Sequence, residues 1–580
     1  MKNNPDEIRV WIPNAEMVEI IVNNDRANMS RDADGWWTYR YRDKTGQIDY
    51  AFFIDGKGPY PDPRSAYQPT GVHGFSRIID HDAFEWMDKN WQSPPVASGI
   101  IYELHVGTFT SQGTFNAIID KLAYLKDIGI THIELMPVNE FSGERGWGYD
   151  SVDIYAPHHS YGGFEGLKTL INACHCNNLG VIIDVVYNHF GPEGNYIENF
   201  APYLIDKYST AWGKAVNYDD RYSDQVRKFV VENALMWLRD YHADGLRLDA
   251  VHAIYDQSAI NILEQIAREV KKLEKQLGRH LFLTAENDLN DPRVVQDFEI
   301  GGYGFDAQWN DNFHHSLHAV LTNDPSGYYE DFREIGDLAK CLRSVFVYDG
   351  IYSNFRKAIH GRPAEKCSGS NYIGFIQNHD QVGNRATGER ISDLCGIEGA
   401  KVAAAIVIIS PFIPLLFQGE EFAAATPFQY FSSHQDPELG KAVTQGRKKE
   451  FSSFGWDPDT VPDPQAVSTF ENSKLNWSQL NEEPHKSMLA WYKDLIKLRK
   501  SFPELCDGSL RNCRIEFSEA RKYIIIKRGS VLTAANFDNS EQELAIEINC
   551  QVLLTSNPDI KIDNAKITLP SKSVVILKCK

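Results

Sequence analysis

From residue 99 to about residue 505 the chain repeats one pattern, a short apolar segment followed by a segment with helical periodicity. Continuously apolar segments of this length are typical of parallel strands that are covered on both faces. The first helical segment, Asn116 to Ile128, is predicted to end at Gly129. The strand segments are, in order, GIIYELHVGTF, THIELMPV, VIIDVVYNH, GLRLDAV, LFLTAEN, residues 306–309, YIGFIQNHD and IPLLFQGEE. Eight such units predict an α/β protein built on a closed (β/α)8 barrel, the TIM barrel.

The alternative arrangement of alternating strands and helices is an open, doubly wound sheet. Such sheets often carry a glycine fingerprint, G-x-G-x-x-G, directly after the first strand. The corresponding stretch here, GTFTSQG, matches it poorly. We therefore prefer the barrel.

Two regions with short alternating strands flank the repeating region. Residues 8 to about 90 contain IRVWIP, VEIIV, GWWTYRY and IDYAFFIDG, which predict an N-terminal antiparallel β-sandwich. Proline-rich segments mark the end of this N-terminal region. At the other end of the chain, a C-terminal antiparallel β domain is predicted by the segments YIIIKRG, VLTAANF, ELAIEIN and SVVILKC. We expect three domains, at residues 1–95, 96–505 and 506–580.

Charge and cysteine content narrow the classes of function. The net charge of −20, from 59 basic and 79 acidic residues, argues against a nucleic-acid partner. No apolar run reaches the roughly 18 to 20 residues that span a bilayer, and the start, MKNNPDEIRVWIP, has no apolar signal-peptide core. The nine cysteines are scattered, and Cys174 and Cys176 have no second pair with which to form a zinc knuckle. We expect a cytoplasmic protein with reduced thiols and no membrane partner.

Polar side chains collect where the predicted barrel strands end, which is where barrel enzymes place their catalytic groups. Strand three ends in Asp184, Asn188 and His189, strand four carries Arg247, Asp249 and His252, strand five ends in Glu286, Asn287 and Asp288, and strand seven ends in Asn378, His379 and Asp380. Barrel packing does not require carboxylates at these positions. The set therefore predicts an active site.

Two carboxylates in different protonation states are what glycoside hydrolysis requires. Arg247 and Asp249 are two residues apart on one strand, so they share a face, and the cation keeps the carboxylate ionised as a nucleophile. A purely structural ion pair is the alternative for these two residues. Glu286 has no cation beside it in the sequence and has the negative Asp288 nearby, so we expect it to be the general acid. Asp380, beside His379, is expected to stabilise positive charge in the transition state.

Aromatic loops support a sugar ligand, and metal catalysis is less well supported. Trp147 and Tyr149 follow strand two, and Phe428, Tyr430 and Phe431 lie in a later loop; for Trp147 we favour packing. A metallohydrolase barrel would usually offer His-x-His on its first strand, but His105 stands alone and is expected to be a core residue. Asp184 and Asn188 could serve a calcium site, although no further oxygen ligands are evident. We expect no metal and no cofactor.

Four ordered segments resemble the signature regions of the α-amylase family of glycoside hydrolases. They are DVVYNH (184–189), GLRLDAVH (245–252), the strand-ending Glu286 and QNHD (377–380). The resemblance implies that Asp249 is the nucleophile, Glu286 the acid/base and Asp380 the transition-state stabiliser. It also implies that His189, Arg247 and His379 contact the sugar at the cleaved bond, that Tyr149 stacks on it, and that Asp184 supports the arginine.

Further segments resemble the trehalose-releasing hydrolases within that family. They include FDAQWNDNFHHSLHA, QNHDQVGNRA and GEEFAAATPFQYFSSH. The resemblance implies an N-terminal sandwich of the immunoglobulin-like, carbohydrate-binding-module-like type. It also implies retaining hydrolysis of the α-1,4 bond beside the terminal trehalose of malto-oligosyltrehalose, an α-glucan substrate. A functional partnership with malto-oligosyltrehalose synthase, in trehalose biosynthesis, is expected. A glycogen branching enzyme and a non-catalytic glucan-binding protein are the alternatives.

Overall fold

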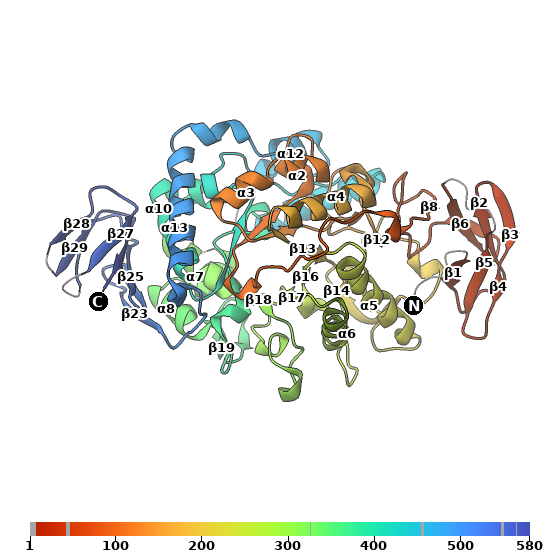
Figure 1. Cartoon of the computed structure of the whole chain (residues 1–580), viewed down its shortest axis with the longest axis horizontal. Coiled ribbons are helices and arrows are strands. Elements are labelled where there is room, and N and C mark those ends of the chain that lie inside the picture. Colours follow the sequence, from red (N-terminus) through yellow and green to blue (C-terminus); the bar gives the residue numbers. More distant parts are fainter. Residues whose placement is uncertain are drawn as a thin grey trace.

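The computed structural model describes residues 7–41, 47–324, 326–453, 457–546, 550–563 and 565–579. The molecule is elongated, with a helix-rich central part and a β-rich part at each end of its long axis (Figure 1). The N-terminal strands form one end and the C-terminal strands form the other. All the candidate site residues belong to the central part.

The central part is a closed barrel of eight parallel strands, which confirms the prediction from the repeating pattern. The strands follow one another around the barrel in chain order, and the eighth pairs with the first. All eight predicted segments are barrel strands. They are β9 (Ile101–Leu104), β10 (His132–Leu135), β13 (Gly180–Val185), β16 (Gly245–Leu248), β17 (Phe282–Ala285), β18 (Ala307–Trp309), β21 (Tyr372–Gly374) and β22 (Ile413–Phe417).

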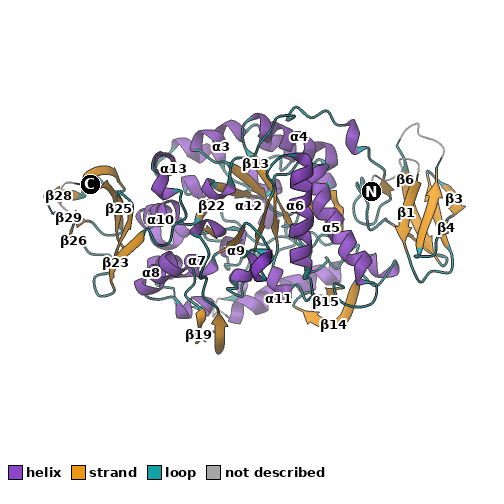
Figure 2. Ribbon diagram, turned by 60° about the horizontal axis from the view of Figure 1, so that its bottom comes forward, coloured by secondary structure: helices purple, strands orange, loops and turns teal. Residues whose placement is uncertain are grey.

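Helices surround the barrel (Figure 2). The longer helices are α4 (Gly163–Cys176), α5 (Ser223–Arg239), α6 (Ile262–Leu277), α7 (Asp311–Thr322), α8 (Ile335–Ser344), α10 (Ile391–Ile409), α11 (Pro437–Ser453) and α13 (His485–Ser501). The shorter ones are α1 (Val106–Phe109), α9 (His379–Gly383) and α12 (Val467–Asn472). Several of the helices contact barrel strands, as α4 does β13, α5 does β16 and α7 does β21, and the residues of these strands are all buried.

The helix predicted between strands one and two is two helices. It divides into α2 (Phe115–Ile119) and α3 (Leu122–Ile128). The two packing partners differ, because α2 lies against α4 whereas α3 lies against α13. The division of the helix coincides with this change of packing partner. The end at Gly129 is as predicted, because this residue has a φ of 104°, which favours glycine.

The two terminal regions are antiparallel, as predicted, and each contains two sheets, which was predicted for the N-terminal region only. In the N-terminal region, β1 (Glu7–Trp11), β5 (Trp36–Arg40) and β4 (Ser30–Arg31) form one sheet; β3 (Asp25–Asn28), β2 (Val18–Val22), β6 (Asp49–Ile54), β7 (Lys57–Tyr60) and β8 (Ser76–Arg77) form the other. In the C-terminal region, β23 (Cys513–Ser518), β24 (Tyr523–Arg528), β25 (Val531–Asn536), β30 (Ser573–Lys578) and β27 (Gln551–Thr555) form one sheet; β26 (Gln542–Ala545), β29 (Lys566–Leu569) and β28 (Lys561–Asp563) form the other. We propose domain boundaries near residues 95 and 505.

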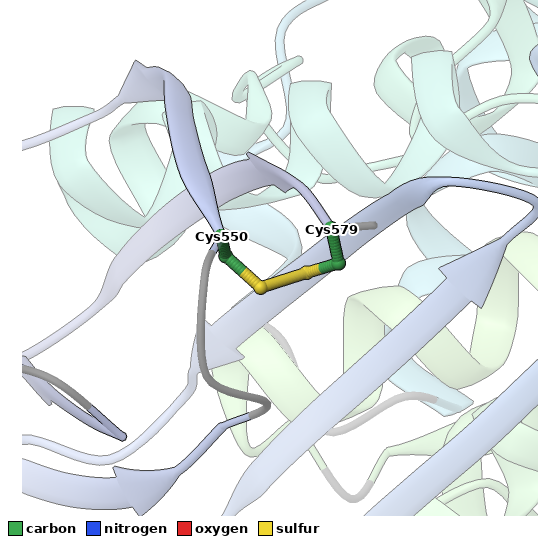
Figure 3. Close-up of a disulfide and its surroundings, with 2 residues drawn as sticks. All are labelled: Cys550 and Cys579. Atoms are coloured by element: carbon green, nitrogen blue, oxygen red, sulfur yellow. A yellow bond between two sulfur atoms is a disulfide. The ribbon is translucent and has the colours of Figure 1, made fainter.

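The expectation that every cysteine is reduced is wrong for two of the nine. Cys550 and Cys579 form a disulfide in the C-terminal region (Figure 3). The pairing of Gln551 with Lys578 in the antiparallel strands β27 and β30 sets the two cysteines opposite each other, with their Cα atoms 4.3 Å apart. Spacing along the chain, 29 residues, gave no sign of this contact.

Three two-stranded sheets extend from the barrel and were not predicted. They are β11 (Asn139–Glu140) with β12 (Asp153–Pro157), β14 (Leu204–Thr210) with β15 (Gly213–Val216), and β19 (Asp349–Ser353) with β20 (Ala358–Gly361). Each follows a barrel strand and lengthens the loop after it. Among the helices described, none combines the length and apolarity needed to cross a membrane.

Candidate active site

The site is built around Arg247, at the centre of β16. Its side chain is inaccessible to solvent and pairs with three carboxylates from three neighbouring strands. Nη1 lies 2.7 Å from Asp184 Oδ2 and 2.9 Å from Asp249 Oδ1, and Nη2 lies 2.5 Å from Glu286 Oε2. The parallel register explains the convergence, because Arg247 pairs with Asp184 of β13 and all three strands end at the same edge. The guanidinium fork also stacks on Trp309, 4.0 Å from the ring centroid.

Asp249 is held as an acceptor on both oxygens. Oδ1 accepts from Arg247, and Oδ2 accepts from Asn188 Nδ2 at 3.0 Å. The arginine and the amide hold the carboxylate in one orientation, and this arrangement suits a nucleophile. Its side chain is 10% exposed, so a substrate can reach it.

The residue after Asp249 connects the two key carboxylates. Ala250 has a φ of 37°, an unusual conformation for a residue with a side chain. This turn directs the Ala250 N–H at Glu286 Oε2, at 3.1 Å, and the next N–H, that of Val251, at the Glu286 carbonyl, at 3.0 Å. The strained turn therefore fixes the position of Glu286 relative to Asp249.

The structure corrects the expected surroundings of Glu286. No cation is adjacent in the sequence, but Arg247 contacts it through space, and the supposedly repulsive Asp288 is paired with Arg356 at 2.5 Å. The pKa of Glu286 is nevertheless raised, because burial and the negative Asp249 outweigh Arg247. Since Oε2 accepts two N–H groups and no hydrogen bond between described residues reaches Oε1, the proton belongs on Oε1.

Asp184 lies behind the arginine, away from the exposed edge. Its Oδ2 accepts from Arg247 and, at 2.7 Å, from the Tyr149 hydroxyl. Burial raises the pKa of Asp184 to about 7, although the Arg247 charge opposes the change. It contacts the arginine, which is the supporting position that the family resemblance implied.

His379 and Asp380 follow the end of β21 and are the first two residues of α9. The Asp380 carboxylate is 35% exposed and lies 3.6 Å from His379 Nε2. Tyr149 stacks on the His379 ring, with centroids 5.0 Å apart. Asp380 and Glu103 raise the pKa of His379 to about 9, against the effect of burial. Glu103 was missed in the sequence, although a carboxylate inside a fully buried strand is a signal that could have been read.

His189 and His252 lie near the two key carboxylates, His189 next to Asn188, which binds Asp249, and His252 near Glu286. Burial lowers the pKa of His189 to about 4, so this ring is neutral. Its face is covered by Trp212, with ring centroids 4.6 Å apart, from the unpredicted β14–β15 hairpin. His252 Nδ1 accepts from the Asp288 N–H at 3.3 Å and lies near enough to Glu286 to affect its pKa.

Two of the aromatic residues predicted to line the site are core residues instead. Phe428 and Phe431 are fully buried around Trp147, which stacks on Phe428 with centroids 5.2 Å apart. The packing favoured for Trp147 is therefore confirmed. Tyr149 and Tyr430 remain partly accessible. Phe428 and Phe431 are withdrawn as candidates for sugar contact.

One group of potential metal ligands occurs among the described residues, outside the Arg247 centre. Glu140, His158 and His159 have ligand atoms within 4.8 Å of one another. His159 Nδ1 bonds to Glu140 at 2.7 Å, and His158 Nδ1 accepts from the Ser160 N–H at 3.2 Å. His158 Nε2 then carries the ring proton and offers no lone pair, so we assign the group as an ion pair between His159 and Glu140. His105 is buried and bonds to the Gly146 carbonyl, as expected of a core residue.

Comparisons with known proteins agree with this architecture. Residues 73–212 match the family model described as the alpha amylase catalytic domain. Malto-oligosyltrehalose trehalohydrolases from Arthrobacter ramosus and Saccharolobus solfataricus are 46% and 44% identical, over 90% and 94% of this chain and 91% and 93% of theirs. A branching enzyme from Pseudoalteromonas atlantica is 26% identical, over 86% of this chain and 66% of its own.

Solved structures match over the whole length. A crystal structure of a Salmonella typhimurium protein described as an alpha amylase has a TM-score of 0.91 at 36% identity, covering 99% of this chain and 97% of its own. A pullulanase from Anoxybacillus in complex with maltotetraose has a TM-score of 0.72 at 17% identity, covering 100% of this chain and 87% of its own, and shows a shared fold only.

Proposed function

The chain belongs to the malto-oligosyltrehalose trehalohydrolases of the α-amylase family, and on that premise we propose the bond that it cleaves and the residues that cleave it. It is a glycoside hydrolase acting on α-1,4-linked glucan. The bond is the α-1,4 linkage between the maltodextrin chain and the terminal trehalose, and the products are trehalose and a shortened maltodextrin. The observation that carries the assignment is the sharing of Arg247 by two carboxylates, Asp249, which accepts hydrogen bonds on both oxygens, and Glu286, whose pKa is raised.

Cleavage begins when Asp249 attacks the anomeric carbon of the maltodextrin glucose unit that is linked to trehalose. The bond from that carbon to the glycosidic oxygen breaks as a carboxylate oxygen of Asp249 bonds to it. Glu286 transfers its Oε1 proton to the departing oxygen, so trehalose leaves as an alcohol. The result is a maltodextrin ester of Asp249 and an ionised Glu286.

A water molecule completes the reaction. Ionised Glu286 takes its proton, and the water oxygen bonds to the anomeric carbon as the ester bond to Asp249 breaks. Two inversions at one carbon give net retention. Retaining enzymes hold their carboxyl groups about 5 to 5.5 Å apart, closer than the ~6.5 to 9.5 Å of inverting enzymes. Carboxylates on the two Nη atoms of one guanidinium fit the closer arrangement.

The remaining residues bind the sugar at the cleaved bond. Asp380 is the most exposed carboxylate of the group and is placed to stabilise the positive charge of the transition state. His379 donates to a sugar hydroxyl, and the neutral His189 ring, whose Nδ1 donates to Asn188 Oδ1, contacts the sugar without donating to it. Arg247 orients both acids, and Tyr149 stacks on the ring. We also propose that malto-oligosyltrehalose synthase supplies the substrate.

Product analysis tests the proposed function. Purified protein incubated with maltotriosyl-trehalose is expected to release trehalose and maltotriose, with maltopentaose cleaved far more slowly. Branch formation on linear glucan would identify a transferase, and equal cleavage of both oligosaccharides would contradict the specificity. Proton NMR of the first turnovers should show the new reducing end as the α-anomer, whereas a β-anomer would exclude retention.

A further inference from the structure

Glu103 lies in the first barrel strand and binds a residue at the end of the seventh. Its Oε2 accepts from the His379 backbone N–H at 2.9 Å, and its Oε1 bonds to the His379 ring Nδ1 at 2.5 Å. Both side chains are about 1% exposed. One carboxylate thus fixes both the backbone and the ring of His379, which determines the direction of the ring.

The contact leaves only the other ring nitrogen for the active site. With Nδ1 bound by Glu103, Nε2 is directed toward Asp380 Oδ1, 3.6 Å away. The ring is held on one face by Tyr149 and at its edge by Trp147, with centroids 5.0 and 5.5 Å away. A sugar hydroxyl beside Asp380 would therefore meet an N–H donor on a ring that cannot turn.

The charge of this ring depends on groups from several elements. Carboxylates raise the pKa of His379 to about 9, whereas burial and the Arg247 cation lower it. The titratable or charged groups that face it are Glu103 on β9, Glu134 on β10, Arg247 on β16, His105 and Tyr149 in loops, and the adjacent Asp380. Of these, Glu103 alone among the described residues binds Nδ1 at a distance typical of a charge-assisted hydrogen bond.

We propose that Glu103 is a positioning residue of the active site, which keeps His379 an oriented imidazolium that donates from Nε2 to the sugar beside Asp380. The identity of the sugar in this proposal rests on the proposed function, whereas the charge of the His379 ring does not depend on it. A cationic donor binds a hydroxyl more strongly than a neutral one does. The competing explanation is that Glu103 only satisfies a buried histidine, with no effect on catalysis.

Glu134 provides a matched control on the neighbouring strand. It pairs with Glu103 in the register between β10 and β9 and is equally buried. Neither of its carboxylate oxygens has a hydrogen-bond partner among the described residues. Burial and the negative Glu103 raise the pKa of Glu134 well above its ordinary value, so it is neutral. Replacing it by glutamine removes an acid of the same size without removing a charge.

The primary experiment is an NMR titration of ring-labelled histidine in the full-length protein, with the His379 signal assigned by its loss in His379→Gln. We expect His379 to titrate well above neutrality in the wild type and in Glu134→Gln. In Glu103→Gln its pKa should fall by about 1 to 3 pH units, and Glu103→Asp should restore part of the difference. A wild-type His379 that titrates at or below its ordinary pKa would overturn the proposal without any variant.

Kinetics supply the second readout. Glu103→Gln should lower kcat/KM about 10- to 100-fold, as expected for one charge-assisted hydrogen bond. Because the ring stays cationic over a narrower range, the part of the alkaline limb that follows His379, as distinct from the part that follows Glu286, should move to lower pH. Equal loss at every pH, or equal loss in Glu134→Gln, would show a merely structural role. If the wild type released no trehalose, the proposed function would be wrong. The NMR titration would still show whether Glu103 controls the charge of His379.

Discussion

Two clusters of buried charge lie at the ends of barrel strands, and they differ in what surrounds their acids. The Arg247 cluster contains Asp184, Arg247, Asp249 and Glu286; the β22 cluster contains Arg390, Glu420 and Glu421. Each combines one fully buried arginine with acids at or after a strand end. In the sequence, QGEE after strand eight resembles the other acidic strand ends.

The acids of the β22 cluster are buried and accept hydrogen bonds from neutral tyrosine hydroxyls. Tyr492 donates to Glu420 Oε1 at 2.7 Å, and Tyr124 and Tyr102 donate to Glu421 at 2.8 and 3.1 Å. Arg390 donates to the backbone carbonyls of Gln418 and Thr426, and it forms no ion pair with any residue that the structure describes. Burial raises the pKa of Glu420 to about 8 and that of Glu421 to about 7.

In the Arg247 cluster, by contrast, the cation contacts all three acids directly, and two of them reach solvent. The comparison indicates that acidic strand ends are not sufficient for a site. Direct contact with the cation and an open side for the substrate distinguish the reactive cluster from the structural one. The following predictions, in order of expected effect, test that distinction.

The largest effect is expected for Asp249→Ala. Loss of the nucleophile should lower kcat by about 10⁴-fold or more, while the Arg247 pairs with Asp184 and Glu286 keep the protein folded. Steady-state kinetics and a melting curve measure the two quantities. Azide in place of the lost carboxylate should partly restore turnover of an activated maltoside and give a β-glycosyl azide. Wild-type-like turnover would refute the assignment.

Glu286→Gln is expected to lower turnover of malto-oligosyltrehalose by about 10² to 10⁴-fold. The loss should be smaller for an activated aryl maltoside, whose leaving group needs little protonation. In the wild type kcat/KM should fall as pH rises through the elevated pKa of Glu286, because the acid must carry its proton. The variant should lack that limb, and a variant with the wild-type pH profile would assign the general acid elsewhere.

The same substitution in the two buried arginines is expected to have different effects, on activity for Arg247 and on stability for Arg390. Arg247→Met should lower kcat/KM about 10² to 10³-fold, because Asp249 and Glu286 lose the cation that both of them contact. Arg390→Met should instead lower the free energy of unfolding by about 1 to 3 kcal/mol, through lost hydrogen bonds to buried carbonyls. Its specific activity per folded molecule should stay near that of the wild type. A large catalytic defect in Arg390→Met would contradict the distinction.

The smallest effect on activity is expected for Glu420→Gln combined with Glu421→Gln, within about twofold of the wild type if the β22 cluster is only structural. Both carboxyls have raised folded-state pKa values, so the folded protein binds more protons than the unfolded chain near neutrality. Their contribution to stability is complete below the unfolded pKa and is lost as pH rises through 7 to 8. Melting temperatures from pH 5 to 9 should fall less steeply in the double variant; equal slopes would assign the pH dependence to other acids.

Much of the barrel could be predicted because its strands are buried on both faces, which forces continuous apolar segments such as VIIDV. The split between α2 and α3 could not, because it depends on packing against α4 and α13. The hairpin that brings Trp212 to His189 likewise depends on loop conformation. In the site, Asp249 and Arg247 were predicted as a pair because residues two apart share a strand face.

The sequence by itself determined the order of the strands and the residues at their ends, since periodicity and residue type are local properties. It did not reveal that Arg247 also contacts Glu286, that Glu103 binds His379, or that Phe428 and Phe431 are buried. Only the closed barrel decided these points. Closure brings strands that are far apart in the chain to one edge, and there the protonation state of each acid depends on its neighbours in space.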